Sequence, residues 1–109
     1  MVMKNRKRKS KPKKQTIEIM SQEMVQRAIT EVCDEMKAFL LGKNEAYGNS
    51  ALEPIRIMSR CSPLEGIRVR IDDKLNRMLK GTEYMGDNDI KDVTGYYILL
   101  MVGKQLGLS

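Results

Sequence analysis

The sequence has no histidine and no tryptophan, and its 109 residues include one phenylalanine and two cysteines. Without histidine there is no imidazole general base, no catalytic triad of the usual kind and no His-bound metal. The cysteines, Cys33 and Cys61, form no CxxC pair, which favours reduced thiols in a cytoplasmic setting. Any chemistry must therefore use carboxylates, Lys, Arg, Tyr, Ser or Cys, and the core must be aliphatic and rich in methionine.

A long hydrophobic run is also missing. The longest run, from Tyr96 to Val102, is far shorter than the roughly 20 residues that a membrane-spanning helix needs. No apolar segment follows the basic N-terminus, so we expect no secretion signal. A chain of this length supports one small domain. The sequence predicts a cytoplasmic protein without a membrane partner.

Residues 1–14 lack acidic side chains and carry eight Lys and Arg, whereas the rest of the chain has twelve Lys and Arg against fourteen Asp and Glu. Because such a segment cannot bury apolar surface, we expect a disordered tail over 1–15 and a folded domain over 16–109. The tail is either a solubilising charge run or a sequence-neutral contact for nucleic acid. The cations available for that contact are Lys4, Arg6, Lys7, Arg8, Lys9, Lys11, Lys13 and Lys14.

Hydrophobic spacing and capping residues predict an all-α fold with three main helices and one short helix. The first helix is expected from Ser21, as N-cap, to Leu41, with Gly42 just beyond its end. A loop over 43–54 and a short helix over 55–61 follow. The sequence Ser62-Pro63-Leu64-Glu65 predicts a capped start for the next helix, which ends at Gly81. The last helix runs from Asp87 or Asn88 to Lys104.

The last helix is apolar around most of its circumference. Its expected buried face consists of Ile90, Val93, Tyr97, Leu100 and Met101, and three more apolar residues, Ile98, Leu99 and Val102, lie outside that face. A helix that is apolar all round is usually buried all round, which a domain this small cannot achieve alone. We therefore expect a homodimer.

The loop over 43–54 carries more chemistry than a linker needs. In one interpretation it is part of a binding site, where Lys43 reaches a phosphate, Tyr47 stacks on a base, and Asn44, Asn49 and Ser50 bond a base or sugar. Gly48 would allow a turn with positive φ beside the ligand. In the other interpretation the segment is a folded connection whose asparagines satisfy loop backbone and whose tyrosine covers the core.

Charged residues recur on three of the expected helices. The 62–81 helix carries Arg70, Lys74 and Arg77 beside Asp73, and the spacing of Asp73 and Arg77 predicts an ordinary helical ion pair. Tyr96 lies one turn beyond Asp92 on the last helix. Carboxylates on separate packed helices suit an oxygen-ligand magnesium site, and solvated or dipole-complementing acids are the alternative. The candidate magnesium ligands are Glu31, Glu35, Asp73, Asp89 and Asp92.

Three segments, "KNEAYGNSALEPIRIMSR", "RVRIDDKLNR" and "DIKDVTGYYILL", resemble small proteins of phages and prophages. They are similar to the phage nucleotide-modification-associated domain family, which is distantly similar to the all-α nucleotide pyrophosphohydrolases of the MazG type. The resemblance covers roughly residues 31–103. In the pyrophosphohydrolases, ExxE and ExxD elements bind the magnesium that activates water. Here Asp89 to Asp92 matches the second element with Asp for Glu, and Glu31 to Asp34 has the spacing of the first.

The resemblance implies a nucleotide-binding protein in the cytoplasm of a phage host. Its acidic elements depart from the family pattern, so a magnesium-dependent pyrophosphohydrolase and a protein that only sequesters nucleotides both remain open. Its expected ligand-binding residues are Lys43, Asn44, Tyr47, Asn49, Ser50, Arg70, Lys74, Arg77 and Tyr96. The alternative is an accessory protein without catalysis that binds nucleic acid or a host protein through its basic tail.

Overall fold

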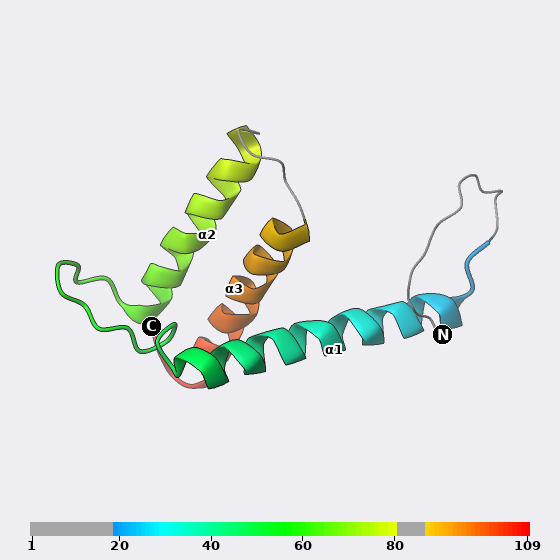
Figure 1. The fold of residues 1–109 in the computed structure, drawn as a ribbon, viewed down its shortest axis with the longest axis horizontal. Coiled ribbons are helices and arrows are strands. Elements are labelled where there is room, and N and C mark those ends of the chain that lie inside the picture. Colours follow the sequence, from blue (N-terminus) through cyan, green and yellow to red (C-terminus); the bar gives the residue numbers. More distant parts are fainter. Residues whose placement is uncertain (1–18, 81–86) are drawn as a thin grey trace. The chain divides into compact units, whose positions relative to one another are not determined.

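The computed structural model of the chain describes residues 19–80 and 87–109 (Figure 1). Three helices form: α1 (Gln22–Tyr47), α2 (Pro63–Lys80) and α3 (Asp87–Gln105). The described residues contain no strand, so the predicted all-α class is confirmed. The basic tail and Gly81 lie outside the described residues. No described helix combines the length and apolarity that crossing a membrane requires.

The chain divides into two compact units, Met1–Val32 and Cys33–Ser109. The described part of the first unit is the segment from Ile19 to Val32, which holds the first half of α1. Ser21 caps this helix as predicted, because its hydroxyl accepts the backbone N–H of Met24 at 3.0 Å.

The core of the second unit lies between α2 and α3, which pack side by side as an antiparallel pair (Figure 1). Three residues of α2 form its centre, and none of them is more than 4% exposed: Leu64, Ile67 and Ile71. Partly buried side chains from the loop, from α3 and from the C-terminal segment pack around them: Leu52, Tyr96, Leu99, Leu100 and Leu108. Helical spacing along α2 predicts an apolar stripe of Leu64, Ile67, Ile71, Leu75 and Met78. Its first three members are buried, whereas Leu75 is 42% exposed.

Two glycines set how closely α3 approaches its neighbours. A β-carbon at Gly103 would lie 2.5 Å from Cδ2 of Leu64 on α2, and one at Gly95 would lie 3.2 Å from Cδ2 of Leu40 on α1. The packed face of α3 therefore runs through its glycines and through Tyr96, Leu99 and Leu100.

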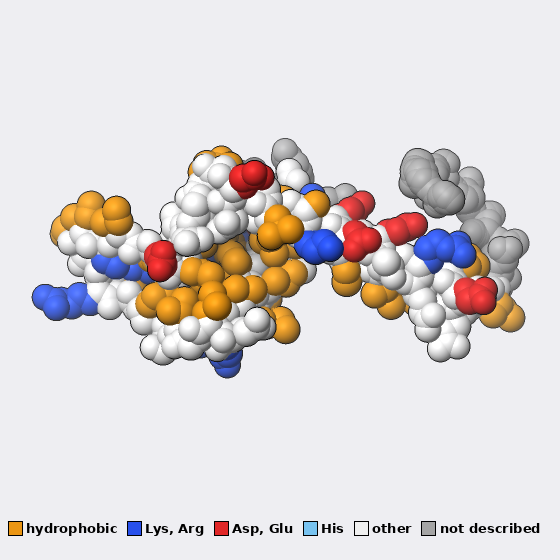
Figure 2. Space-filling model, turned by 90° about the horizontal axis from the view of Figure 1, so that it is seen from below, with side chains coloured by type: hydrophobic (Ala, Val, Ile, Leu, Met, Phe, Trp, Pro, Cys, Tyr) orange, Lys and Arg blue, Asp and Glu red, His pale blue; other side chains and the backbone are white. Residues whose placement is uncertain are grey.

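The predicted buried face of α3 is wrong at three positions. Ile90, Tyr97 and Met101 are 58%, 50% and 70% exposed. The prediction centred the buried face on these bulky apolar side chains, whereas the packed face of α3 also includes Gly95 and Gly103, which a search for large apolar residues does not select. An apolar surface on α3 consequently remains open to solvent, and Figure 2 shows hydrophobic side chains on the outside of the molecule.

The predicted end of α1 at Leu41 is also wrong. The helix continues through Gly42 to Tyr47, and Gly48 ends it with a φ of 69° and an N–H bond to the Asn44 carbonyl at 2.7 Å. A glycine inside a helix costs only about 1 kcal/mol, so Gly42 does not have to break it. Gly48 does so because it takes the left-handed conformation that glycine tolerates best.

The short helix predicted over 55–61 does not form. That segment is a loop, and its apolar residues Ile55, Ile57 and Met58 are 86–93% exposed. One or two turns of helix without a packed face are marginal in water, which explains the loop. The loop leads into α2, where the hydroxyl of Ser62 accepts the N–H of Glu65 at 3.3 Å, as the predicted cap requires.

Candidate functional site

The connection after α1 is an ordered loop held by two asparagines. The side-chain amide of Asn44 donates to the Gly48 carbonyl at 3.2 Å and to Oδ1 of Asn49 at 2.8 Å. The carbonyl of Asn49 accepts the N–H groups of Leu52 and Glu53 at 3.0 and 2.7 Å. Tyr47, the last residue of α1, lies beside this loop at the surface and is 70% exposed. The asparagines therefore order the loop whether or not they also contact a ligand.

This loop forms one wall of a pocket of about 260 Å³, which we call the tyrosine pocket. Half-buried Leu40, Leu52 and Leu99 give it aliphatic surface, and Arg70 and Tyr96 close it from α2 and α3. The polar residues of its wall are Lys43, Asn44, Tyr47, Asn49 and Ser50. A pocket lined by an exposed aromatic ring, aliphatic side chains and side-chain amides suits a flat, polar-edged ligand.

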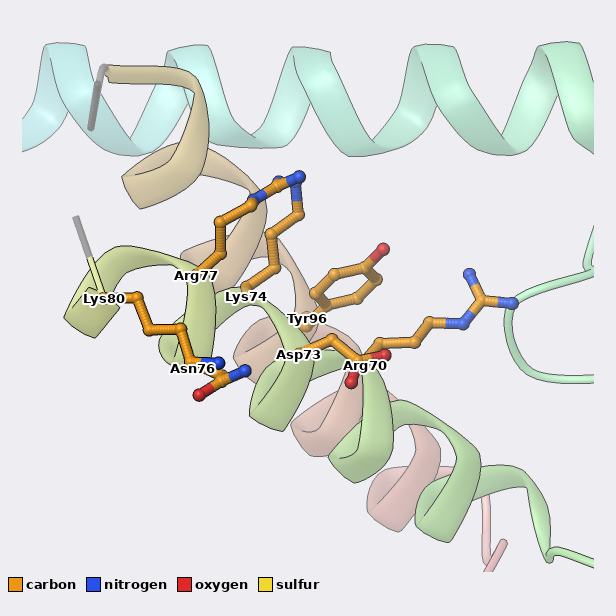
Figure 3. Close-up of a pocket in the computed structure, with 7 residues that line it drawn as sticks. All are labelled: Arg70, Asp73, Lys74, Asn76, Arg77, Lys80 and Tyr96. Carbon is orange, nitrogen blue, oxygen red and sulfur yellow. The ribbon is translucent and has the colours of Figure 1, made fainter. Parts of the chain in front are cut away.

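A second pocket, of about 630 Å³, shares Arg70 and Tyr96 with the first and therefore adjoins it. We call it the cationic pocket, because four Lys and Arg side chains and one carboxylate line it (Figure 3). Its residues are Arg70, Asp73, Lys74, Asn76, Arg77, Lys80 and Tyr96. The two pockets together are called the groove below.

Acidic residues of α3 hold two of these cations in place. The ammonium of Lys74 lies 2.9 Å from Oδ2 of Asp92 and 3.6 Å from Oδ1 of Asp89, and the Arg77 guanidinium lies 3.3 Å from the same Asp89 oxygen. Asp89 is the most buried member, with its side chain 13% exposed. The expected pair of Asp73 with Arg77 is wrong, since Arg77 reaches across to α3 instead. Figure 3 shows Lys74 and Arg77 extending in the same direction.

Arg70 differs from these two cations. It is exposed, it lines both pockets, and within the described part of the chain it forms no ion pair. In Figure 3 its side chain extends away from Lys74 and Arg77. No acid among the described residues pairs with its guanidinium, whose N–H donors can bind a ligand at the junction of the two pockets.

The candidate magnesium ligands do not form a recognisable cage among the residues that the structure describes. No three of these acidic or cysteine side chains lie together in a group suited to a metal ion. Glu31 and Glu35 are exposed on α1, and Asp89 and Asp92 face Lys74 and Arg77, whose charges disfavour a second cation. Asp73 lines the cationic pocket. A magnesium ion at this site stays a prediction.

Sequence reasoning missed several residues around the groove. Asn76 and Lys80 line the cationic pocket, and each lies three residues along α2 from a predicted member, Asp73 or Arg77. That helical spacing was the available signal. Phe39 was also missed: Lys43 and Lys91 lie 5.2 and 4.6 Å from its ring centre. The pairing of Phe39 with Lys91 joins α1 to α3, and spacing along one helix does not reveal it.

All nine predicted ligand-binding residues line the groove, seven of them in the tyrosine pocket and four in the cationic pocket, with Arg70 and Tyr96 in both. They come from α1, the loop after it, α2 and α3. No family model, curated protein or solved structure matches the chain in the comparisons with known proteins. The function is therefore inferred from the residues that line the groove.

Proposed function

We propose that this protein binds a nucleotide in the groove, with the phosphates in the cationic pocket and the base and sugar in the tyrosine pocket. One observation carries the proposal: a cationic pocket and an aromatic, amide-edged pocket adjoin and share Arg70 and Tyr96. A nucleotide has the same division into a charged part and a flat, polar-edged part.

The cationic pocket supplies what a phosphate chain needs. Arg70 offers a planar fork of N–H donors that can bind two phosphate oxygens at once, which gives charge-assisted bonds of roughly twice the usual strength. Lys74 and Arg77 are already oriented by Asp89 and Asp92. Little side-chain freedom is lost when an anion binds such pre-positioned cations, and this favours affinity.

The tyrosine pocket supplies what a base needs. The exposed ring of Tyr47 offers a stacking surface, and half-buried Leu52 and Leu99 provide apolar contact. Both side-chain N–H donations of Asn44 are used within the loop, so its Oδ1 is left to accept a bond from the amino or imino group of a base.

Magnesium enters this proposal through the ligand. Mg²⁺ commonly binds proteins through one or two carboxylates together with substrate phosphates. Asp73 is the carboxylate that lines the cationic pocket, and it forms no ion pair with another described residue. We therefore expect magnesium to arrive with the phosphates and to contact Asp73. This arrangement serves sequestration and pyrophosphate hydrolysis equally well.

The test is isothermal titration with dNTPs, NTPs and cyclic dinucleotides, with and without Mg²⁺. Arg70→Gln should weaken binding at least tenfold, since each 1.4 kcal/mol of lost interaction is a factor of ten. The matched control is Arg68→Gln: Arg68 lies on the same helix, pairs with Glu65 at 3.2 Å and lines neither pocket. Absence of binding to every nucleotide contradicts the proposal.

Turnover is measured separately, as release of pyrophosphate from any nucleotide that binds. Release that depends on Mg²⁺ and is lost in Asp73→Asn identifies a hydrolase. Tight binding without release identifies a sequestering protein. Equal affinity of Arg70→Gln and the unmodified protein would place the ligand elsewhere.

The second candidate function is contact with nucleic acid through the tail. It is favoured by eight Lys and Arg within residues 1–14, a charge density that the remaining chain does not share.

A further inference from the structure

The first half of α1 carries an apolar stripe that no other part of the described ranges, 19–80 and 87–109, covers. Met24, Val25, Ile29 and Val32 are 53%, 40%, 56% and 56% exposed. With 3.6 residues per helical turn, these side chains and Ala28 fall on one side of the helix. Figure 2 shows hydrophobic side chains at the surface along this helical segment, on the right of the view.

The same stripe is an interface further along α1. The spacing continues from Val32 to Met36, Phe39 and Leu40, and Met36 is buried. A β-carbon at Gly95 of α3 would lie within 4 Å of all three of these side chains. One side of α1 is therefore packed on α3 in its second half and open in its first half. This continuity indicates that the open half also belongs to an interface.

The open halves of two antiparallel copies of α1 would be complementary to each other. Val25 and Val32 are equally far from the midpoint between Ala28 and Ile29. If a second copy of α1 lies antiparallel across this midpoint, Val25 of each copy faces Val32 of the other. The small side chain of Ala28 lies beside the two-fold axis, where it allows the helices to approach closely. We propose that this stripe is an antiparallel homodimer interface.

The packing of α1 favours this arrangement. Helical spacing places Glu23, Arg27 and Asp34 on the opposite side of the helix, whereas Glu31 and Glu35 lie along one edge of the stripe, at the rim of the proposed pair. A parallel pair would set the Met36 faces of two copies against each other, although α3 already covers that face. An antiparallel pair overlaps only the open halves and opposes the helix dipoles. The inference is independent of the proposed ligand, because no groove residue lies before Leu40.

Cysteine crosslinking tests the geometry. In a Cys33→Ser, Cys61→Ser background, Val25→Cys and Val32→Cys are made as separate proteins, one with a size tag, and oxidised alone and mixed. In the antiparallel pair, equal positions lie about 10 Å apart along the axis, at 1.5 Å per residue, which is too far for a disulfide. Only the mixture should therefore crosslink, as a heterodimer. Crosslinking of either protein alone, or none in the mixture, overturns the proposal.

Sedimentation over a concentration series tests the association itself. The unmodified chain should reach twice its monomer mass of 12.5 kDa. Ile29→Glu, which places a charge in the stripe, should sediment as a monomer. The control is Thr30→Glu, which adds the same charge at the next residue, on the side of α1 opposite the stripe. This variant should remain a dimer. A monomeric unmodified chain, or a dimer that Ile29→Glu leaves intact, overturns the proposal.

Discussion

Gly42 and Gly103 both lie in helices, but their substitution by alanine should change the stability of the protein in opposite directions. At Gly103 the new β-carbon would lie 2.5 Å from Cδ2 of buried Leu64, whereas at Gly42 it would meet nothing within 4 Å. Overpacking costs about 1–3 kcal/mol, and replacing a helical glycine by alanine gains about 1 kcal/mol. Gly103→Ala should therefore lower the melting temperature and Gly42→Ala should raise it. Equal shifts of the same sign in calorimetry contradict the observed packing.

Asp92 is the residue whose role changes most between sequence and structure. The sequence predicts it as a magnesium ligand, with an acid that complements the helix dipole as the alternative; the structure pairs it with Lys74 at 2.9 Å. Asp92→Asn leaves Lys74 with Asp89 at 3.6 Å, and both members of the lost pair are partly exposed. We expect a loss of about 1 kcal/mol.

For a domain of this size, such a loss lowers the melting temperature by about 4–8 °C. The control is Asp72→Asn on α2: Asp72 is exposed and lines neither pocket, so its neutralisation should change stability by less than about 0.5 kcal/mol. Coincident melting curves for Asp92→Asn and the unmodified protein would show that the pair contributes nothing.

At the scale of the helix, the end of α1 at Gly48 determines the course of the loop that lines the tyrosine pocket. Alanine at a φ of 69° costs about 1–2 kcal/mol, whereas asparagine tolerates this conformation. Gly48→Ala should therefore reduce stability and weaken nucleotide binding, because the pocket wall from Gly48 to Leu52 follows from this turn. Gly48→Asn should restore both. Titration and thermal melting of the two variants check this, and unchanged binding in Gly48→Ala contradicts it.

Local chemistry made some elements predictable. Ser21 and Ser62 carry side-chain oxygens that satisfy the first N–H groups of a helix, and such caps are visible in sequence. The apolar spacing of α2 predicted the buried residues Leu64, Ile67 and Ile71 for the same reason. The predicted groove residues came from side chains with evident binding chemistry, together with the family resemblance.

Features that depend on distant residues were not predictable. Gly95 and Gly103 are unfavourable residues for a helix when the sequence is considered alone. The close approach of Leu40 to Gly95 and of Leu64 to Gly103 explains why glycine fits at these positions. The partner of Lys74 was missed because the acids of α3 approach α2 only after the chain folds back. The segment over 55–61 has a local pattern compatible with a helix, and it remains a loop because no neighbouring surface covers it.

For the molecule as a whole, the uneven charge predicts that the two proposed binding activities can be separated by removing the tail. The full chain should bind duplex DNA or RNA with an affinity that falls steeply with salt, at a slope of about −0.9 per neutralised phosphate. A chain that starts at Thr16 lacks the eight tail cations, so this binding should disappear while nucleotide binding by titration is unchanged. Equal nucleic-acid binding by the two chains would exclude the tail as the contact.

The groove also has an optical consequence. Of the four tyrosines in the chain, Tyr47 and Tyr96 line the groove, and no tryptophan is present to dominate the emission spectrum. Intrinsic fluorescence is therefore tyrosine fluorescence, and Tyr47 and Tyr96 line the proposed base site. A base bound in the groove should quench this emission. Because no tryptophan emission masks the tyrosine signal, ligand binding can be followed in solution without a label.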